Sequence, residues 1–145
     1  MIYDIDDKGV HTLLQNRYSI ALFESHLKND CEHHFKKIEE TIDKIKTHHK
    51  VKEKTLYVIR DDKSQICKHY KQKCDGSDEF DMLLIKVNWD SGKMAGLQAI
   101  EEMLSHCSLS VCLFDGTNKV ENIYMSKIDP FSTINYVIYT GVEHG

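Results

Sequence analysis

Two nearly continuous apolar runs restrict most strongly what this chain can fold into. They are FDMLLIKVNW at 80–89 and LSVCLF at 109–114. A strand that is apolar along its whole length is typical of a parallel sheet covered by helices, because both of its faces are then buried. Between the two runs, residues 92–107 carry apolar side chains at helical spacing. The sequence therefore predicts two parallel strands joined by a helix.

A second unit of the same kind precedes these runs. Residues 55–60, TLYVIR, are rich in β-branched and aromatic side chains and predict a strand. Residues 61–73 predict a helix capped by Asp61 or Asp62. The predicted order β-α-β-α-β implies right-handed crossovers and a parallel core.

The first third of the chain predicts helices. Asp6 or Asp7 is placed to cap a helix whose apolar stripe includes Ala21 and Leu22. In the next segment, apolar residues recur at steps of four and three, at Cys31, Phe35, Ile38, Ile42 and Ile45. Such a narrow seam predicts packing against the first helix as a helical hairpin over 1–50, with a homodimer through the seam as the alternative.

The C-terminal part predicts an antiparallel meander. Asp115-Gly116 lies between strand-like runs and indicates a hairpin turn, and residues 120–128 and 134–141 would be the last strands. The predicted fold is thus one α/β domain over 1–145. It has a helical hairpin at 1–50, followed at 51–145 by a mixed sheet of about five strands with a parallel core, flanked by helices and ending in an antiparallel hairpin.

Charge is distributed unevenly and suggests a protein-binding function. Residues 28–73 carry thirteen bases and eight acids, whereas 74–145 carry four bases and eleven acids. An acidic surface speeds the capture of a basic partner. We therefore expect a regulatory protein without catalytic residues that binds another, basic protein, as a toxin-neutralising immunity protein does. The expected contact residues are acids with an aromatic anchor: Asp75, Asp78, Glu79, Trp89, Asp90, Asp115 and Tyr124.

The ends of the predicted parallel strands support an alternative, enzymatic function. Ligands of such sheets bind at the carboxyl ends of the strands, where Asp61, Asp90 and Asp115 are expected to meet. Carboxylates suit Mg²⁺, and Lys93 would contact a phosphate group. The alternative is a magnesium-dependent enzyme acting on phosphate esters or nucleotides. Each aspartate also has an ordinary role as a helix cap or turn residue.

The basic segment raises two further possibilities. Its lysines, seven of which lie within 36–54, would suit a phosphate- or RNA-binding module, although interleaved acids also stabilise an exposed helix. Cysteine and histidine residues of the same segment form a candidate zinc site: Cys31, His34, Cys67, His69 and Cys74.

Three short stretches resemble parts of known families. Residues 81–100 resemble the central strand and following helix of response-regulator receivers, with Lys86 where the phospho-acceptor aspartate belongs. DEFDML at 78–83 is similar to the paired-acid strand of nucleotidyltransferases, which implies metal binding by Glu79 and Asp81. LFDGT at 113–117 resembles the haloacid-dehalogenase signature, with Leu113 in place of the nucleophile. Each resemblance is local, and none assigns the chain to a family.

The sequence also suggests a cellular location. The acidic N-terminus lacks the pattern of a secretory signal, and no apolar run reaches the ~20 residues that span a bilayer. Five cysteines without regular spacing favour a reducing compartment. We expect a cytoplasmic protein that does not bind membranes.

Overall fold

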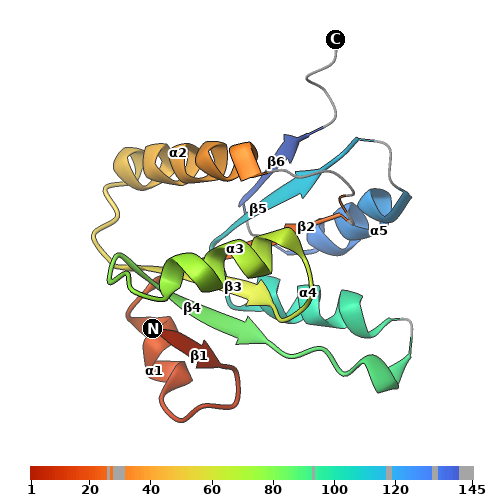
Figure 1. Ribbon diagram of the computed structural model, residues 1–145, viewed down its shortest axis with the longest axis horizontal. Coiled ribbons are helices and arrows are strands. Elements are labelled where there is room, and N and C mark those ends of the chain that lie inside the picture. The colour runs from red at the N-terminus through yellow and green to blue at the C-terminus, as the bar shows by residue number, and fades with distance from the viewer. Residues whose placement is uncertain (26, 28–31, 93, 117–118, 132–133, 141–145) are drawn as a thin grey trace.

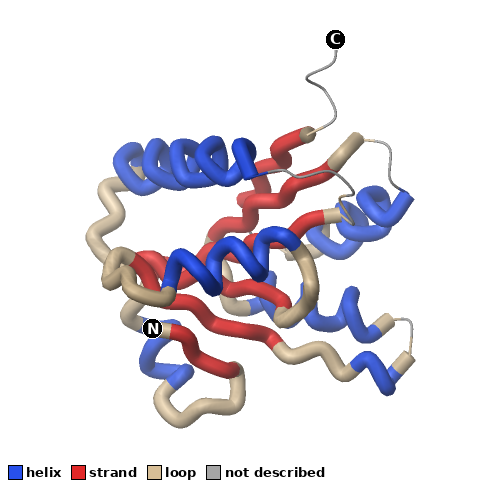
Figure 2. The backbone as a smooth tube through the Cα atoms, in the orientation of Figure 1, coloured by secondary structure: helices blue, strands red, loops and turns tan. Residues whose placement is uncertain are grey.

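Six parallel strands form one sheet at the centre of the computed structural model, as Figures 1 and 2 show. The structure describes residues 1–145 apart from 26, 28–31, 93, 117–118, 132–133 and 141–145. The strand order across the sheet is β1-β4-β3-β2-β5-β6, and every pair of neighbours is parallel. The strands are β1 (Ile2–Asp4), β2 (Tyr18–Glu24), β3 (Thr55–Arg60), β4 (Phe80–Ile85), β5 (Leu109–Phe114) and β6 (Ile134–Tyr139).

Helices cover both faces of the sheet and create two hydrophobic cores. On one face lie α2 (Glu32–His48) and α3 (Gln65–Cys74), and on the other lie α1 (Val10–Gln15), α4 (Ala95–Ser105) and α5 (Lys119–Ile128). A short 3₁₀ turn, η1 (Trp89–Ser91), precedes α4. Residues that alternate along each inner strand enter opposite cores, which explains why the strands are apolar throughout. The α/β class is therefore confirmed.

The predicted N-terminal helical hairpin is wrong, because residues 18–24 form β2, a central strand of the sheet. Ile20 and Leu22 enter the core beneath α2, whereas Ala21 and Phe23 enter the core beneath α4. This alternation has a period of two, and a short apolar run does not reveal whether it is a strand or a helix. The helix over 32–48 is confirmed, but its apolar seam packs on the sheet. A single domain over 1–145 stays a prediction.

The predicted antiparallel C-terminal hairpin is also wrong. Residues 119–128 form the helix α5, and β6 runs parallel to β5. The buried residues of α5, Glu121, Tyr124 and Ile128, have helical spacing. A type I′ turn needs positive φ at both central residues, but only Gly116 has it, with φ of 91°. The backbone N–H groups of Asp115 and Gly116 instead donate to the Glu121 carboxylate, which fixes this loop as the start of a helix.

The parallel sheet confirms that the exits of β3, β4 and β5 lie along one edge, with the end of β2 between β3 and β5. After β2, the chain adds β3 and then β4 on one side of β2. It then reverses direction across the sheet and adds β5 and β6 on the other side of β2. In a doubly wound sheet, the crevice beside this reversal is the usual place for a ligand. The carboxyl ends of β2 and its neighbours are therefore the expected place for a ligand. No helix within the described ranges has the length and apolar character needed to cross a membrane.

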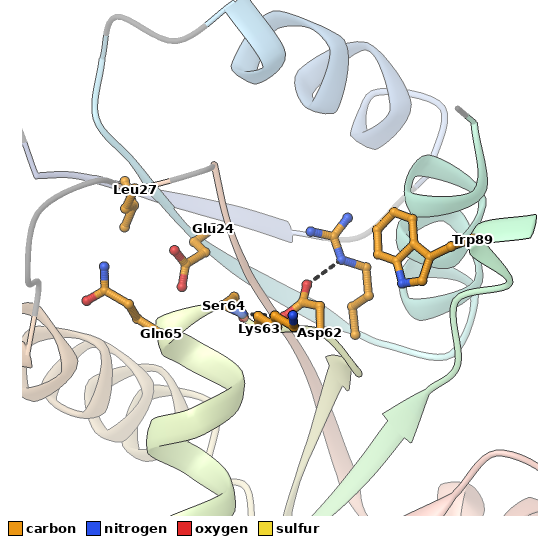
Figure 3. A pocket seen from close by; sticks show the side chains of 8 residues that line it. Glu24, Leu27, Asp62, Lys63, Ser64, Gln65 and Trp89 are labelled. Carbon is orange, nitrogen blue, oxygen red and sulfur yellow. Dashed lines mark hydrogen bonds and ion pairs between the residues drawn. The ribbon is translucent and has the colours of Figure 1, made fainter. Parts of the chain in front are cut away.

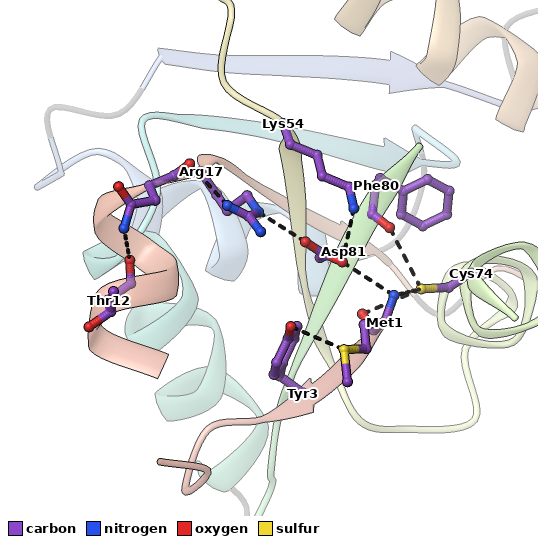
Figure 4. A network of polar contacts seen from close by, with 9 residues as sticks. Met1, Tyr3, Thr12, Arg17, Lys54, Cys74, Phe80 and Asp81 are labelled. Carbon is purple, nitrogen blue, oxygen red and sulfur yellow. Dashed lines mark hydrogen bonds and ion pairs between the residues drawn. The ribbon is translucent and has the colours of Figure 1, made fainter. Parts of the chain in front are cut away.

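At the opposite, amino edge, Asp81 is buried among cationic groups (Figure 4). Its carboxylate accepts from Arg17 Nε at 2.9 Å, from the Met1 amino group at 3.2 Å and from Lys54 Nζ at 3.4 Å. Burial alone would raise the pKa of Asp81, but these donors reverse the effect and hold it below the ordinary value of 3.8. Asp81 therefore ties β1, β2 and the loop before β3 to β4.

Replacing Asp81 with asparagine is expected to remove a stabilising contribution that depends on pH. Because the folded-state pKa lies below the unfolded value, this contribution is complete above the unfolded pKa and disappears as pH falls through the folded pKa. Urea unfolding across a pH series should show D81N less stable than wild type near neutral pH, with the gap closing in acid.

The control is Asp6→Asn. It removes an exposed ion pair between Asp6, whose side chain is 77% exposed, and Lys86, whose side chain is 58% exposed. D6N should follow the wild-type curve. A constant difference between D81N and wild type at all pH values would contradict the assignment of a depressed pKa to Asp81.

Candidate functional site

A pocket of about 740 Å³ opens at the carboxyl edge of the sheet, shown in Figure 3. Its walls come from the ends of β2 and β3, the first turn of α3 and the turn η1 after β4. A volume of this size is typical of sites that bind small molecules. The lining residues are Glu24, Leu27, Arg60, Asp62, Lys63, Ser64, Gln65 and Trp89.

Glu24 ends the central strand β2 and places a buried carboxyl group in this pocket. Its side chain accepts a hydrogen bond from the backbone N–H of Ile66 at 2.8 Å, at the start of α3. Burial raises the pKa of Glu24 above its ordinary value, and the charge of Asp62 acts in the same direction, although backbone hydrogen bonds from Ile66, Gln65 and Leu27 oppose them. A carboxyl group with a raised pKa in a pocket is a common feature of functional sites.

Arg60 ends the neighbouring strand β3 and is held rigidly. Its Nε donates to Asp62 Oδ2 at 2.7 Å, and its Nη1 donates to the carbonyl of Gly96 at 3.2 Å. Asp62 also accepts the backbone N–H of Ser64 at 2.8 Å, which orders the turn that leads into α3. Burial opposes the charge of Arg60, but Tyr124 and Asp62 outweigh it and raise its pKa. A cation is thus fixed at the strand end in a preset orientation.

Trp89 forms the opposite wall of the pocket and is 59% exposed. Its ring lies close to Arg60 across Gly96 in α4. A Cβ atom at position 96 would be 3.1 Å from Arg60 Nη1 and 3.4 Å from Cζ3 of Trp89. Because glycine has no side chain, the Arg60 guanidinium and the Trp89 indole can both pack closely against α4 at this position. The result is a wide aromatic surface beside a fixed cation.

The polar groups around the pocket differ in how many of their hydrogen bonds are already made within the chain. Asp62 already uses both carboxylate oxygens to hold Arg60 and Ser64. Glu24 is buried and accepts backbone N–H groups of Ile66, Gln65 and Leu27, so it has less capacity for a ligand than the exposed Lys63 and the face of Trp89. The pocket combines an aromatic surface with charges of both signs, so it suits a ligand that has a flat ring, hydrogen-bonding groups and an anionic group.

A second polar cluster fills the crevice between β2 and β5. The Ser25 hydroxyl donates to Glu121 Oε2 at 2.5 Å, and the backbone N–H groups of Asp115 and Gly116 donate to the same carboxylate at 2.7 and 3.1 Å. Glu121 is 7% exposed. The chain's own carboxylate therefore occupies these donors, and the open pocket lies on the β2–β3 side of the reversal.

The structure separates the residues predicted to contact a basic protein. Asp75, Asp78 and Glu79 follow α3 or lie in the loop before β4, at the amino edge of the sheet. Trp89, Asp90 and Asp115 lie beyond the opposite ends of β4 and β5. Tyr124 is 2% exposed and packs against Phe23 and Phe114, so it is not available as a surface anchor. Binding of a basic partner stays a prediction, but these residues do not form one continuous face.

The three aspartates proposed as magnesium ligands are not gathered into a metal site. Among the described residues, no group of three or more His, Cys, Asp or Glu side chains is arranged to hold a metal ion. Asp61 is paired with Lys71 at 2.9 Å. Asp81, a metal ligand by the nucleotidyltransferase resemblance, is surrounded by the cationic groups of the amino edge. Lys93 and Cys31 lie outside the described residues, so their predicted roles stay predictions.

Sequence reasoning found Trp89 and the end of β3, where Arg60 lies, but it missed Glu24 as a site residue. Glu24 was missed because the run Ile20–Phe23 was assigned to a helix. A polar residue directly after an apolar run of strand length is the signal that could have identified it. The sequence did not indicate what holds Arg60 in place, because its contact with the Gly96 carbonyl, 36 positions away, is set by the fold.

Loss of the buried ion pair is expected to destabilise the protein much more than loss of a neighbouring exposed pair. The side chains of Arg60 and Asp62 are 7% and 11% exposed, whereas those of Lys71 and Asp61 are 40% and 41% exposed. We expect Asp62→Ala to cost about 3 kcal/mol, because it leaves a buried cation unpaired. The control Lys71→Ala should cost less than about 1 kcal/mol. Urea unfolding measures both, and equal losses would contradict a structural role for Asp62.

Comparisons were made with protein-family models, with curated proteins and with solved structures, and none of the three gives a match to this chain.

Proposed function

We propose that this protein binds a nucleoside phosphate in the pocket at the carboxyl edge of the sheet. The observation that carries the proposal is the placement of Trp89, Glu24 and Lys63 around one opening of about 740 Å³. These side chains lie at the carboxyl ends of three neighbouring strands, on the β2–β3 side of the reversal that is the usual ligand site of a doubly wound sheet. No reaction is assigned to the site.

Each part of a nucleotide has a matching group in the pocket. The exposed ring of Trp89 offers a stacking surface for a base, and such stacking contributes about 1–3 kcal/mol per base. Glu24 offers a carboxyl group for ribose hydroxyls or an exocyclic amine. Lys63, in the turn before α3, offers a flexible ammonium group for the phosphate. A ring without an anion, or an anion without a ring, would use only part of the site.

The buried pair beneath the opening supports the same ligand class. Arg60 carries a planar guanidinium beside the indole, and Asp62 with Gly96 fixes its orientation. A group that is already ordered costs little further entropy when a ligand binds. The pocket therefore has an ordered cation, Arg60, on its floor and an exposed lysine, Lys63, in its lining.

The test uses the fluorescence of Trp89, which is the only tryptophan of the chain. Adenosine 5′-monophosphate, guanosine 5′-monophosphate and uridine 5′-monophosphate are titrated separately, with adenosine and inorganic phosphate as partial ligands. We expect at least one nucleotide to change the emission saturably and to raise the melting temperature, because a ligand that binds only the folded state stabilises it. The matching nucleoside should bind more weakly, and phosphate alone should leave the emission unchanged.

Two lysine variants separate the phosphate contact from general charge effects. Lys63→Ala should weaken nucleotide binding about fivefold, since it removes one exposed charge pair, and should leave nucleoside binding unchanged. Lys68→Ala, an exposed residue of α3 that does not line the pocket, should bind like wild type. If no nucleotide alters either the emission or the melting temperature, the proposed function is wrong.

A further inference from the structure

The strand β6 leaves one side of the sheet open. It pairs with β5 on its inner side, and no other described strand pairs with its outer side. Its sequence, INYVIY, has no charged residue and no proline over six residues. The outer N–H and C=O groups of such a strand are free to pair with another extended chain.

The outer strand on the other side of the sheet, β1, has features that prevent another strand from pairing with it. β1 has only three residues, ends in Asp4, and is followed by two further acids, Asp6 and Asp7. Short edge strands and charges are devices that prevent strand addition. β6 has neither device, so the two edges differ in how readily they accept a partner.

The open edge also exposes large apolar side chains. Ile134, Tyr136 and Tyr139 are 52%, 39% and 46% exposed. Tyr139 contacts Phe114 on the inner side, with ring centroids 6.3 Å apart. Strand addition would bury these side chains against the alternating side chains of the added chain.

A groove that contains one lysine and two histidines lies beside this edge. It has a volume of about 280 Å³ and lies between the C-terminal half of α2 and β6. Its lining residues are Thr41, Lys44, Ile45, His48, His49 and Tyr136. Lys44, His48 and His49 are all exposed. An extended chain on β6 would therefore carry its side chains past the Lys44 ammonium group and the imidazoles of His48 and His49, whose N–H groups can donate to carboxylates.

We propose that β6 binds an extended acidic peptide segment of another protein as a seventh strand. Backbone hydrogen bonds to β6 would provide affinity, and carboxylates on alternate residues would meet Lys44, His48 and His49. Charge complementarity selects this occupant over a second copy of the chain. Antiparallel pairing of two β6 strands about a two-fold axis keeps both α2 helices on the same side of the joint sheet, which places the two grooves, each with its Lys44, on the same face without an acidic group of the lining to pair with them.

The test uses fluorescein-labelled peptides with the length of β6, read by fluorescence anisotropy. A peptide of alternating valine and glutamate should bind, with an affinity that falls as salt rises, and a peptide of alternating valine and lysine should not. Two versions of the acidic peptide are N-methylated on alternate residues, one version for each edge of the peptide strand. One version should lose binding and the other should keep it, because a strand pairs through only one of its edges.

Protein variants locate the binding surface. Lys44→Glu should weaken binding of the acidic peptide about fivefold, whereas Lys68→Glu, the same change on α3, should leave it unchanged. Both lysines are exposed, so both variants should keep the wild-type melting temperature. Equal effects of the two variants would indicate general attraction and would overturn the proposal.

Other occupants of the edge give different results, each of which overturns the proposal. If neither peptide binds, or if both N-methylated versions bind equally, the edge does not accept an acidic strand. If light scattering shows a dimer that Tyr136→Lys abolishes, the edge belongs to a second copy of the chain. If polyuridylate binds and loses binding in Lys44→Glu while the acidic peptide does not bind, the groove is a nucleic-acid surface. None of these results depends on nucleotide binding at the carboxyl edge.

Discussion

The burial of β2 on both faces is the constraint on which the rest of the structure depends. Its alternating residues supply both hydrophobic cores, and its two neighbours, β3 and β5, continue the sheet in opposite directions. Without this strand the sheet would be divided between β3 and β5. Its direction also decides which edge becomes the rim of the pocket, because every other strand runs parallel to it.

The parallel arrangement also places buried carboxyl groups at both the amino and the carboxyl edge of the sheet, and their partners differ between the two edges. At the amino edge, Asp81 is fully used by cations from other elements. Between β2 and β5, Glu121 is fully used by Ser25 and by backbone N–H groups. At the pocket, Asp62 is used to hold Arg60, whereas Glu24 keeps a raised pKa and faces the opening. The pocket therefore holds buried carboxyl groups that the chain itself orders, beside the exposed side chains of Lys63 and Trp89.

Charge in the sequence and charge in space are different quantities in this protein. Acids that are close in the sequence, such as Glu79 and Asp90, are carried to opposite edges because β4 runs between them. The basic segment is divided in a similar way, with Lys63 at the pocket and Lys44 at the groove beside β6. Two proposed binding surfaces, one for a nucleotide and one for an acidic strand, thus arise from a segment that appears uniform in the sequence.

The sequence alone determined the elements whose signals are local. The sequence predicts strands at 55–60 and 109–114, the bounds of β3 and β5, and helices at 61–73 and 92–107, which overlap α3 and α4. It also predicts a strand at 134–141, which contains β6. The apolar runs also indicated parallel strands and a rim at their carboxyl ends, which brought Trp89 into consideration. These features were predictable because side-chain period and turn residues report the local backbone directly.

Only the tertiary structure decided the identity of β2, the helical state of 119–128 and the composition of the site. A short apolar run such as Ile20–Phe23 is compatible with a strand or a helix until its neighbours bury both faces. Glu121 directs the start of α5 only when Ser25 and the loop after β5 are beside it. Glu24 and Arg60 acquire their roles from contacts to residues 36–42 positions away, and contacts of that separation are set by packing rather than by sequence pattern.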